Sequence, residues 1–274
     1  MNLIDKTQVL IEALPYIKKF KDKIVVIKFG GNAMSEMKSM IEDIVLLKHI
    51  GIKPIVVHGG GPEIDLELKK AKITPRFIDG LRYTDDSIIE IVEQVFRRIN
   101  NEIVAEIISH GAKSVSATGY IKAKQKNPKL GLVGEITGIN EEKIYEVLKS
   151  DFIPVISPIG IGDDGKYYNI NADTVASHIA VALNAEKLTI LTNVDGIIIN
   201  DNCLSHIDLN TARKEIENGT INKGMIPKVE ACMHAVQNHC PKAHLINGLI
   251  PHSLLLEIFT DKGVGTEIVY KNGN

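Results

Sequence analysis

Residues 24–31 have the sequence IVVIKFGG, a β-branched run that ends in a lysine, a phenylalanine and two glycines. The apolar part, residues 24–27, is typical of a buried β-strand, and the glycines predict a turn. Beyond the turn, apolar residues recur at helical spacing from Met37 until Gly51 ends the helix. A strand, a glycine turn and an amphipathic helix in this order indicate a parallel sheet that is covered by helices.

The same order recurs along the rest of the chain. A second strand at residues 55–57 leads into three glycines, and Pro62 suits the first turn of the next helix. A long amphipathic helix is expected over residues 85–110, and residues 113–139 predict short strands and loops. Further elements are expected as a strand at 153–156, a helix from Asp173, a strand at 188–191, a helix at 227–237, a strand at 244–246, a helix from His252 and a strand from Thr266. We therefore expect an α/β fold, a three-layer α/β/α sandwich around a central, mainly parallel open sheet.

Two predicted hairpins interrupt this pattern, and the second marks a boundary between two lobes. Hairpins are expected around Asp79-Gly80 and Asp164-Gly165, and the second interrupts the alternation near residue 160. No Pro-rich or Ser-rich linker marks this boundary, so the lobes 23–160 and 161–274 should share one sheet. Open α/β sheets bind ligands above the carboxyl ends of their strands, which is where the glycine turns gather.

The composition favours a small-molecule enzyme over a nucleic-acid or membrane protein. The 274 residues include 44% hydrophobic and 24% charged residues, so a large core is available. A formal net charge of -2 gives no general attraction to nucleic acid or to an acidic membrane surface. No stretch approaches the roughly 18 apolar residues of a membrane span. Three unevenly spaced cysteines predict reduced core thiols, so we expect a cytoplasmic protein.

The glycine turns offer a place for phosphate. Lys28 lies beside Gly30 and Gly31, so a cation stands next to bare backbone amides at a helix entrance. This lysine alone could equally stand beside a simple turn. The second glycine loop, after His58, falls in the equivalent place of the next strand, and two such loops could cradle a transferring phosphoryl group. His58 itself is expected to be a packing residue.

The familiar nucleotide-binding sequences are absent. The chain has no Walker A sequence and no protein-kinase set of catalytic Asp and metal-binding Asn. Residues 160–165, GIGDDG, match a dinucleotide-binding pattern, but their two aspartates would repel a pyrophosphate and a strand follows instead of a helix. Phosphoryl transfer in this chain must therefore use another scaffold.

Polar residues before two later helices extend the candidate site. Asn169 and Asn171 alternate along an extended segment and could present two amides to a polar substrate. Asn171 or Asp173 could equally be a helix cap. Lys228 follows a proline at a helix start, where the helix dipole disfavours a cation unless an anion is bound. Arg82, beside the first hairpin, could grip a carboxylate with two hydrogen bonds or be an ordinary surface arginine.

Six segments together resemble the acetylglutamate kinases, a group within the amino acid kinase family. They are KFGGNAM at 28–34, the glycine loop after His58, GLR at 80–82, YNINAD at 168–173, GMIPK at 224–228 and the stretch 255–266. They occur in the family's order over nearly the whole chain, and NINAD and MIPK distinguish this group from carbamate, aspartate and UMP kinases. The resemblance implies that the side-chain carboxylate of N-acetyl-L-glutamate attacks the γ-phosphoryl of MgATP, which yields an acyl phosphate in arginine synthesis.

The resemblance also assigns roles by position. Catalysis would fall to Lys28, Lys228, Asp173, Gly31 and Gly60: the lysines neutralise phosphoryl oxygens, Asp173 organises the lysines, and the glycines donate amides. The substrate would be bound by Gly60, Gly61, Arg82, Asn169 and Asn171. ATP would be bound by Lys28, Gly30, Gly31, Thr192 and Lys228. No residue is expected to ligate a metal, because the phosphates would hold the magnesium ion.

Residues 1–22 are expected to form a kinked helix outside the sheet. Asp5 and Gln8 fit a capping box, and Pro15 should kink the helix. One helical face is apolar, with Ile4, Ile11, Leu14 and Ile17. This stripe could pack on its own body, but it resembles the extension of arginine-inhibited members, whose paired helices join dimers into a hexameric ring. The resemblance then implies feedback inhibition by arginine, bound by Tyr16, Glu257 and Gly263.

The chain departs from the family pattern at Tyr83, Asn193 and Lys223 and in the loop 116–122, and none of these departures removes a proposed charged catalytic group. Two alternatives remain open. One is a related kinase for acetylaminoadipate, which is one methylene longer. The other is a catalytically weak arginine-sensing binding module, against which the intact pair of lysines argues.

Overall fold

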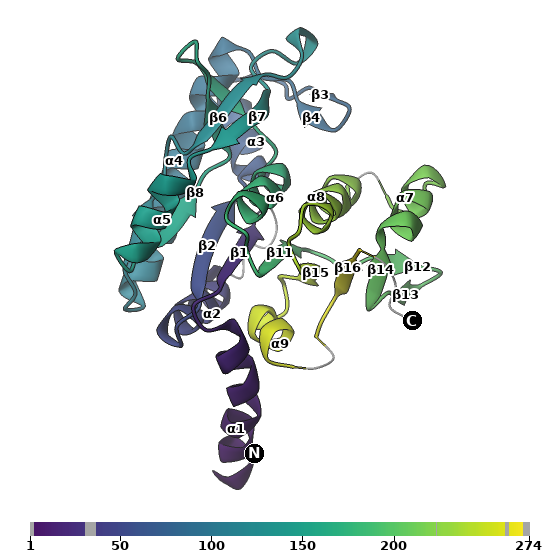
Figure 1. The fold of residues 1–274 in the computed structure, drawn as a ribbon. Helices are drawn as coiled ribbons and strands as arrows, with labels where there is room; N and C mark the ends of the chain where they lie inside the picture. Colours follow the sequence, from purple (N-terminus) through teal and green to yellow (C-terminus); the bar gives the residue numbers. More distant parts are fainter. Residues whose placement is uncertain (1–2, 31–36, 223, 261–262, 271–274) are drawn as a thin grey trace.

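The computed structural model describes residues 3–30, 37–222, 224–260 and 263–270. Its centre is an eight-stranded sheet with the spatial order β14-β16-β15-β11-β1-β2-β8-β5 (Figure 1). These strands are β1 (Ile24–Phe29), β2 (Lys53–His58), β5 (Ser114–Ser116), β8 (Ile153–Ile156), β11 (Lys187–Thr192), β14 (His206–Asp208), β15 (Ala243–Asn247) and β16 (Thr266–Val269). Neighbours in this sheet pair in parallel except β15 and β16, which confirms the predicted mainly parallel sheet.

The central strands form because their side chains are buried on both faces. Every residue of β11 is buried, and in β1 and β2 all residues after the first are buried. Such near-continuous apolar runs are typical of parallel strands between helical layers. Strand β1 extends two residues beyond the expected 24–27, so that Lys28 still pairs with Ile190 and Val57. A lysine therefore lies in the middle of the sheet.

Helices cover both faces of this sheet, which confirms the three-layer prediction (Figure 1). On one face α6 packs beside α8, and on the other α2 contacts α4 and α9. The helices that follow β1 are α2 (Met37–His49), α3 (Gly61–Lys70), α4 (Asp86–Ser109), α5 (Glu141–Lys149), α6 (Ala172–Ala182), α7 (Leu209–Glu217), α8 (Ile226–Gln237) and α9 (Ser253–Phe259), with a 3-10 turn at Pro128–Leu130.

A second sheet of four strands lies apart from the first, in the order β10-β9-β6-β7. Its strands are β6 (Ile121–Gln125), β7 (Gly134–Ile139), β9 (Ile159–Ile161) and β10 (Tyr167–Asn169). The β9–β10 hairpin turns at Asp164-Gly165, as predicted. The first predicted hairpin is also present, with β3 (Phe77–Ile78) and β4 (Leu81–Arg82) joined by Asp79 and Gly80 at positive φ. The prediction did not place 159–169 in one sheet with 121–139.

Several features differ from the prediction. Helices α5 and α7, strand β14 and the hairpin of β12 (Ile198–Ile199) with β13 (Asn202–Cys203) were not predicted. Helix α1 (Leu3–Phe20) begins before Asp5, so Asp5 lies inside the helix and is not its N-cap. Gln8 Nε2 instead donates to Glu12 Oε1 at 3.0 Å, one turn further on. Cys232 and Cys240 are buried as expected, whereas Cys203 is exposed.

Helix α1 projects away from the body of the molecule and meets it at α9 (Figure 1). Pro15 lies inside this helix, which continues to Phe20. No helix in the described part of the chain has both the length and the apolar composition needed to cross a membrane.

Candidate active site

Three charged side chains from distant parts of the sequence meet in the middle of the fold. Lys28 comes from β1, Asp173 from the first turn of α6 and Lys228 from the first turn of α8. Lys28 Nζ lies 2.7 Å from Asp173 Oδ1, and Lys228 Nζ lies 3.1 Å from Asp173 Oδ2. The side chains of Lys28 and Asp173 are 8% and 4% exposed, and that of Lys228 is 22% exposed. The predicted convergence of both lysines on Asp173 is therefore present in the structure.

This cluster has one more positive than negative charge when all three groups are ionised. Burial by itself would raise the pKa of Asp173, but the two lysines outweigh it and hold that pKa below its ordinary value. Burial lowers the pKa of Lys28, the Asp173 charge opposes this shift, and the Lys228 charge adds to it. A buried surplus of positive charge is costly unless an anion compensates it. The cluster therefore suits an anionic group such as a transferring phosphoryl.

Two glycine loops lie against each other beside this cluster. The Gly59 N–H donates to the Phe29 carbonyl oxygen across an N···O distance of 2.8 Å. A Cβ on Gly30 would lie 2.7 Å from Gly59 N, and a Cβ on Gly60 would lie 2.8 Å from Ile99 Cδ1. Only glycine fits these two positions without displacing a neighbour. Gly31, the other predicted amide donor, lies outside the described residues.

A cavity of about 190 Å³ opens beside the second glycine loop. Its lining includes all five residues predicted to bind the substrate: Gly60, Gly61, Arg82, Asn169 and Asn171. The Arg82 guanidinium is 2.6 Å from Asp65 Oδ1 and 4.8 Å from the centre of the Phe77 ring. These contacts fix the guanidinium plane at the cavity wall, so Arg82 is not an ordinary surface arginine.

The two asparagines reach the cavity from the end of β10 and from the N-cap of α6. Asn169 Nδ2 donates to Thr84 Oγ1 at 3.2 Å. Asn171 Oδ1 accepts the backbone N–H groups of Asp173 and Thr174 at 2.8 and 3.2 Å. Asn171 therefore caps α6, as one of the two alternatives predicted, and it also lines the cavity. The cap places Asp173 in the first turn of α6, where the helix dipole favours a carboxylate.

Thr192, predicted to bind ATP, ends β11 beside β1 and is 5% exposed. Its carbonyl oxygen accepts the Gly248 N–H at 2.8 Å. It does not line the cavity beside the second glycine loop. Thr192 thus lies at the carboxyl end of β11, the strand next to the one that carries Lys28. The glycine loops follow the carboxyl ends of β1 and β2, on the same side of the sheet.

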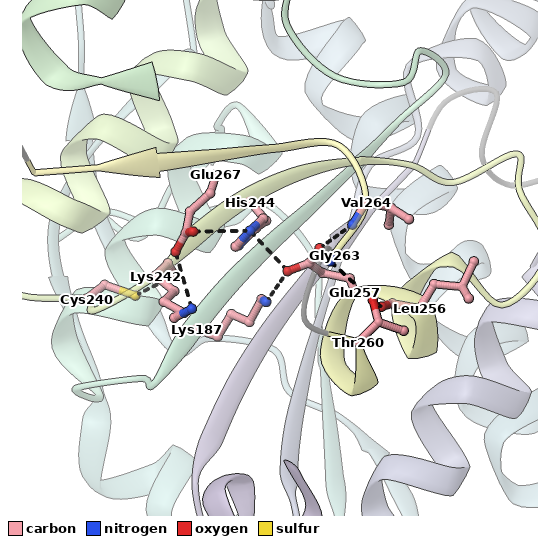
Figure 2. A network of polar contacts seen from close by, with 10 residues as sticks. All are labelled: Lys187, Cys240, Lys242, His244, Leu256, Glu257, Thr260, Gly263, Val264 and Glu267. Atoms are coloured by element: carbon pink, nitrogen blue, oxygen red, sulfur yellow. Dashed lines mark hydrogen bonds and ion pairs between the residues drawn. The ribbon is translucent and has the colours of Figure 1, made fainter. Parts of the chain in front are cut away.

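A second buried carboxylate, Glu257 of α9, forms the network in Figure 2. Its Oε1 is 2.5 Å from Lys187 Nζ and 3.1 Å from His244 Nε2, and its Oε2 accepts the Val264 N–H at 2.8 Å. Burial and then the nearby lysine charges lower the pKa of His244 to about 2, so this imidazole is neutral at physiological pH. Glu257 was predicted as a site residue, whereas Lys187 of β11 and His244 of β15 were not. The available signals were a histidine within the predicted strand 244–246 and a lysine directly before the predicted strand 188–191.

The residues predicted to bind arginine gather around the C-terminal end of α9. The Gly263 N–H donates to Thr260 Oγ1 at 3.2 Å, and a Cβ at Gly263 would lie 2.6 Å from Glu257 Oε2. Tyr16 of α1 lines a hollow of about 590 Å³ with Phe259 and Thr260. Thr260 therefore borders both the Glu257 network and the hollow at Tyr16.

The donor groups near the two lysines suit a phosphate more than a metal. Within residues 3–30, 37–222, 224–260 and 263–270, no group of three His, Cys, Asp or Glu side chains is placed to hold a metal ion. Ammonium groups and backbone N–H groups bind phosphate oxygens, whereas magnesium requires oxygen ligands. The ammonium and N–H groups at this site therefore suit the phosphates of a nucleotide.

The proteins that this chain resembles in sequence are kinases. A family model described as the amino acid kinase family matches residues 23–247. The chain is 51% identical to an acetylglutamate kinase of Thermoanaerobacter pseudethanolicus, with 97% of this chain and 93% of that protein covered. It is 47% identical to an acetylglutamate kinase of Desulforamulus reducens, with 97% and 98% covered.

Solved structures show the same fold. An N-acetylglutamate synthase of Neisseria gonorrhoeae, complexed with coenzyme A and N-acetyl-glutamate, superposes with a TM-score of 0.90 at 24% identity. The match covers 97% of this chain and 64% of the synthase chain. A carbamate kinase of Giardia superposes with a TM-score of 0.71 at 17% identity, with 91% of this chain and 99% of that chain covered.

Proposed function

The chain belongs to the amino acid kinase family, and we propose that it transfers the γ-phosphoryl group of MgATP to N-acetyl-L-glutamate in arginine biosynthesis. The products are N-acetyl-L-glutamyl 5-phosphate and ADP, so the enzyme is a phosphotransferase with a carboxyl group as acceptor. Relatives of this activity are 51% and 47% identical over nearly their whole length. The observation that carries the proposal is the pairing of Lys28 and Lys228 with one carboxylate, Asp173.

The reaction needs positioning and charge more than proton transfer. A side-chain carboxylate oxygen of the substrate forms a bond to the γ-phosphorus, and the bond from that phosphorus to the bridging oxygen breaks. The bridging oxygen leaves with the electron pair as part of ADP. The attacking carboxylate is already an anion, so no general base is required. Bound magnesium neutralises part of the triphosphate charge and is held mainly by the phosphates.

The protein supplies fixed positive groups around the transferring phosphoryl. Lys28 and Lys228 neutralise its oxygens, whose charge the transition state spreads. Asp173 holds one ammonium group on each carboxylate oxygen and thereby fixes the distance between them. Gly60 donates its backbone N–H from the second glycine loop, and Gly31 has the same role in the first.

The cavity beside the cluster holds the acceptor. Arg82, fixed by Asp65 and Phe77, binds the carboxylate that does not react. Asn169 and Asn171 present side-chain amides to the rest of the substrate. Binding at these points places the reacting carboxylate against the phosphoryl held by the lysines.

A coupled ADP-release assay tests the substrate. With MgATP, kcat/KM should be higher for N-acetyl-L-glutamate than for N-acetyl-L-aminoadipate by about 10-fold or more. A pocket typically lowers kcat/KM by about this factor for a substrate with one extra methylene. Equal or greater efficiency with the longer acid would identify an acetylaminoadipate kinase. Arginine binding with no turnover of either acid would identify a sensing module.

A matched pair of arginine variants tests the cavity. Arg82→Lys keeps the charge but loses the planar fork, so KM for N-acetyl-L-glutamate should rise about 10-fold. Arg76→Lys is the control, because Arg76 stacks 4.2 Å from the Tyr83 ring centre and does not line the cavity. An equal rise in KM for both variants would contradict the role of Arg82.

The two lobes divide the ligands in this proposal. Residues 23–160 carry the acetylglutamate site and the dimer contact, and residues 161–274 carry ATP binding, with Thr192 and Lys228. Gly30, Gly31 and Lys28 complete the phosphate contacts from the first lobe. The reaction takes place in the cytoplasm.

Feedback inhibition by arginine is the second part of the proposal. Tyr16, Glu257 and Gly263 bind the inhibitor around the end of α9, where α1 meets the body. Helix α1 exposes apolar residues that suit pairing with α1 of a second copy: Val9, Leu10, Ile11 and Leu14, exposed by 51%, 72%, 59% and 43%. Paired α1 helices would join dimers into a hexamer, which couples the inhibitor site to assembly.

Removal of residues 1–22 tests this coupling. The truncated enzyme should keep its activity but lose the hexamer and the arginine inhibition, as measured by light scattering with a kinetic titration. Leu10→Glu should weaken the hexamer in the full chain because it places a charge on the apolar face. Lys69→Glu, exposed on α3, is the control that should leave the hexamer intact. A truncated enzyme that remains hexameric and inhibited would refute the coupling.

A further inference from the structure

His58 lies at the end of β2, directly before the second glycine loop, and its side chain is completely buried. Its ring packs edge-on against Phe96, with ring centres 5.8 Å apart and planes at 72°. Its Nδ1 lies 2.9 Å from the carbonyl oxygen of Gly59. The expected packing role is therefore present, but the ring also holds the first peptide of the loop.

Asn100 of α4 determines which ring nitrogen carries the proton. Asn100 Nδ2 lies 3.0 Å from the Val155 carbonyl oxygen and 3.3 Å from His58 Nε2. A carbonyl oxygen only accepts hydrogen bonds, so the Asn100 side chain must turn its NH2 group, and not its oxygen, toward Val155. This NH2 group only donates, and it also faces His58 Nε2. His58 Nε2 must then accept, and the ring proton is on Nδ1, which donates to Gly59. Burial lowers the pKa of His58 to about 4, so the ring is neutral at physiological pH.

The Gly59 carbonyl and the Gly60 N–H belong to one planar trans peptide. Fixing the oxygen therefore fixes the direction of the N–H on the opposite side of the C–N bond. The other end of Gly59 is also fixed, because its N–H donates to the Phe29 carbonyl at 2.8 Å. Glycines rotate freely at little cost, so a loop of three glycines needs such anchors to keep one orientation.

We propose that His58 is a positioning residue for phosphoryl transfer, held by Asn100 in its Nδ1–H form so that it anchors the Gly59 carbonyl and aims the Gly60 N–H at the transferring phosphoryl. The inference rests on the proposed kinase function, in which Gly60 donates that N–H. The imidazole neither contacts the substrate nor exchanges a proton in the reaction. Its contribution is the orientation of one amide donor.

Two variants at His58 separate anchoring from packing. His58→Leu fills most of the space but cannot donate, so kcat should fall about 10²-fold, as expected for a misplaced catalytic group. The KM values for ATP and N-acetyl-L-glutamate should change less than about threefold, because the amide acts mainly in the transition state. His58→Asn places an amide NH2 near the position of Nδ1 and should retain kcat within about fivefold.

The control is Ile103→Val, a buried change on α4 one turn beyond Asn100, which should leave kcat unchanged. A folded His58→Leu enzyme with the wild-type kcat would overturn the proposal. So would equal losses of kcat in His58→Leu and His58→Asn when circular dichroism shows both folded.

A measurement without substrate tests the tautomer directly. In ¹⁵N NMR of histidine-labelled protein between pH 6 and 9, His58 should be neutral and protonated at Nδ1, and Asn100→Leu should shift the proton toward Nε2. A wild-type ring protonated at Nε2 would overturn the proposal. Because this readout needs no turnover, an inactive wild-type enzyme would refute the kinase function and leave the tautomer result separate.

Discussion

Two buried carboxylates in this chain bind lysines, and their charge balance differs. Asp173 holds Lys28 and Lys228, one on each oxygen. Glu257 holds Lys187 on one oxygen and accepts the Val264 N–H on the other, beside a neutral histidine (Figure 2). Both carboxylates are at most 5% exposed, so burial does not distinguish the two clusters. The surplus positive charge at Asp173 is the feature that suits this cluster to an anion.

The difference matters because buried ion pairs are otherwise weak guides to function. A balanced pair in the interior can be replaced by apolar residues at little cost, so its presence alone indicates structure. An unbalanced cluster keeps a net charge whose burial costs free energy, and a bound anion lowers that cost. The comparison therefore predicts that loss of a lysine reduces catalysis at Asp173 and stability at Glu257.

The largest expected effect is on catalysis. Lys28→Met and Lys228→Met should each lower kcat by about 10²- to 10³-fold, since each removes one fixed charge from the transition state. The KM for ATP should rise less than about 10-fold. Lys187→Met is the matched control, because it removes a buried lysine from the other cluster, and its kcat should stay within about threefold of wild type. If steady-state kinetics show the same loss of kcat in Lys187→Met as in Lys28→Met and Lys228→Met, the proposed difference between the two clusters is wrong.

The next largest effect is on stability, where Lys187→Met should have a larger effect than Lys228→Met. Lys187→Met leaves Glu257 buried with an uncompensated charge and should lower the free energy of unfolding by about 3–5 kcal/mol. Combining it with Glu257→Leu should recover most of that loss. Lys228→Met removes surplus charge and should cost less than about 1 kcal/mol. Urea unfolding measures all three, and a Lys228→Met enzyme less stable than Lys187→Met would contradict the charge balance.

The smallest effect concerns a third carboxylate, Asp43 of α2, which is 2.6 Å from His252 Nδ1 at the start of α9. The hydrogen bond to Asp43 raises the pKa of His252 above its ordinary value. Its stabilisation is therefore complete below the unfolded pKa of about 6.5 and is lost as pH rises through the higher folded value. His252 is half exposed, so solvent limits the effect to about 1 kcal/mol or less.

His252→Ala should therefore lower Tm by about 2–4 °C at pH 6 and by less at pH 9. A thermal melt at both pH values measures the difference. His239→Ala, which removes an exposed histidine that follows α8, is the control for the loss of an exposed imidazole. A constant difference in Tm across this range would show that the His252 charge is not involved.

The sequence predicted the elements whose signals are local. Strand β8 falls on the predicted residues 153–156, and the hairpin at Asp79-Gly80 follows from turn residues. Helix α5 also had a local signal, with Asn140 as N-cap and Ile144 and Leu148 on one face, but it is short and was missed. The separate four-stranded sheet could not be predicted, because residues 121 and 159 belong to one sheet only through long-range pairing.

The candidate site shows the same limit. Family resemblance, and not spacing, brought Lys28, Asp173 and Lys228 together before the structure did. The contacts of Lys187 with Glu257 and of His58 with Asn100 join residues 70 and 42 positions apart. A period-2 or period-3.6 pattern shows that such a residue is buried but not which partner neutralises or orients it.

In the proposed reaction, Lys28 and Lys228 act together on one γ-phosphoryl group. The most direct measurement is a crystal structure of the enzyme with ADP, magnesium, aluminium fluoride and N-acetyl-L-glutamate. Both Nζ atoms should lie about 3 Å from the fluoride ligands of the transition-state analogue while Asp173 still contacts them. An analogue held in this way by only one lysine, or bound away from Asp173, would contradict it.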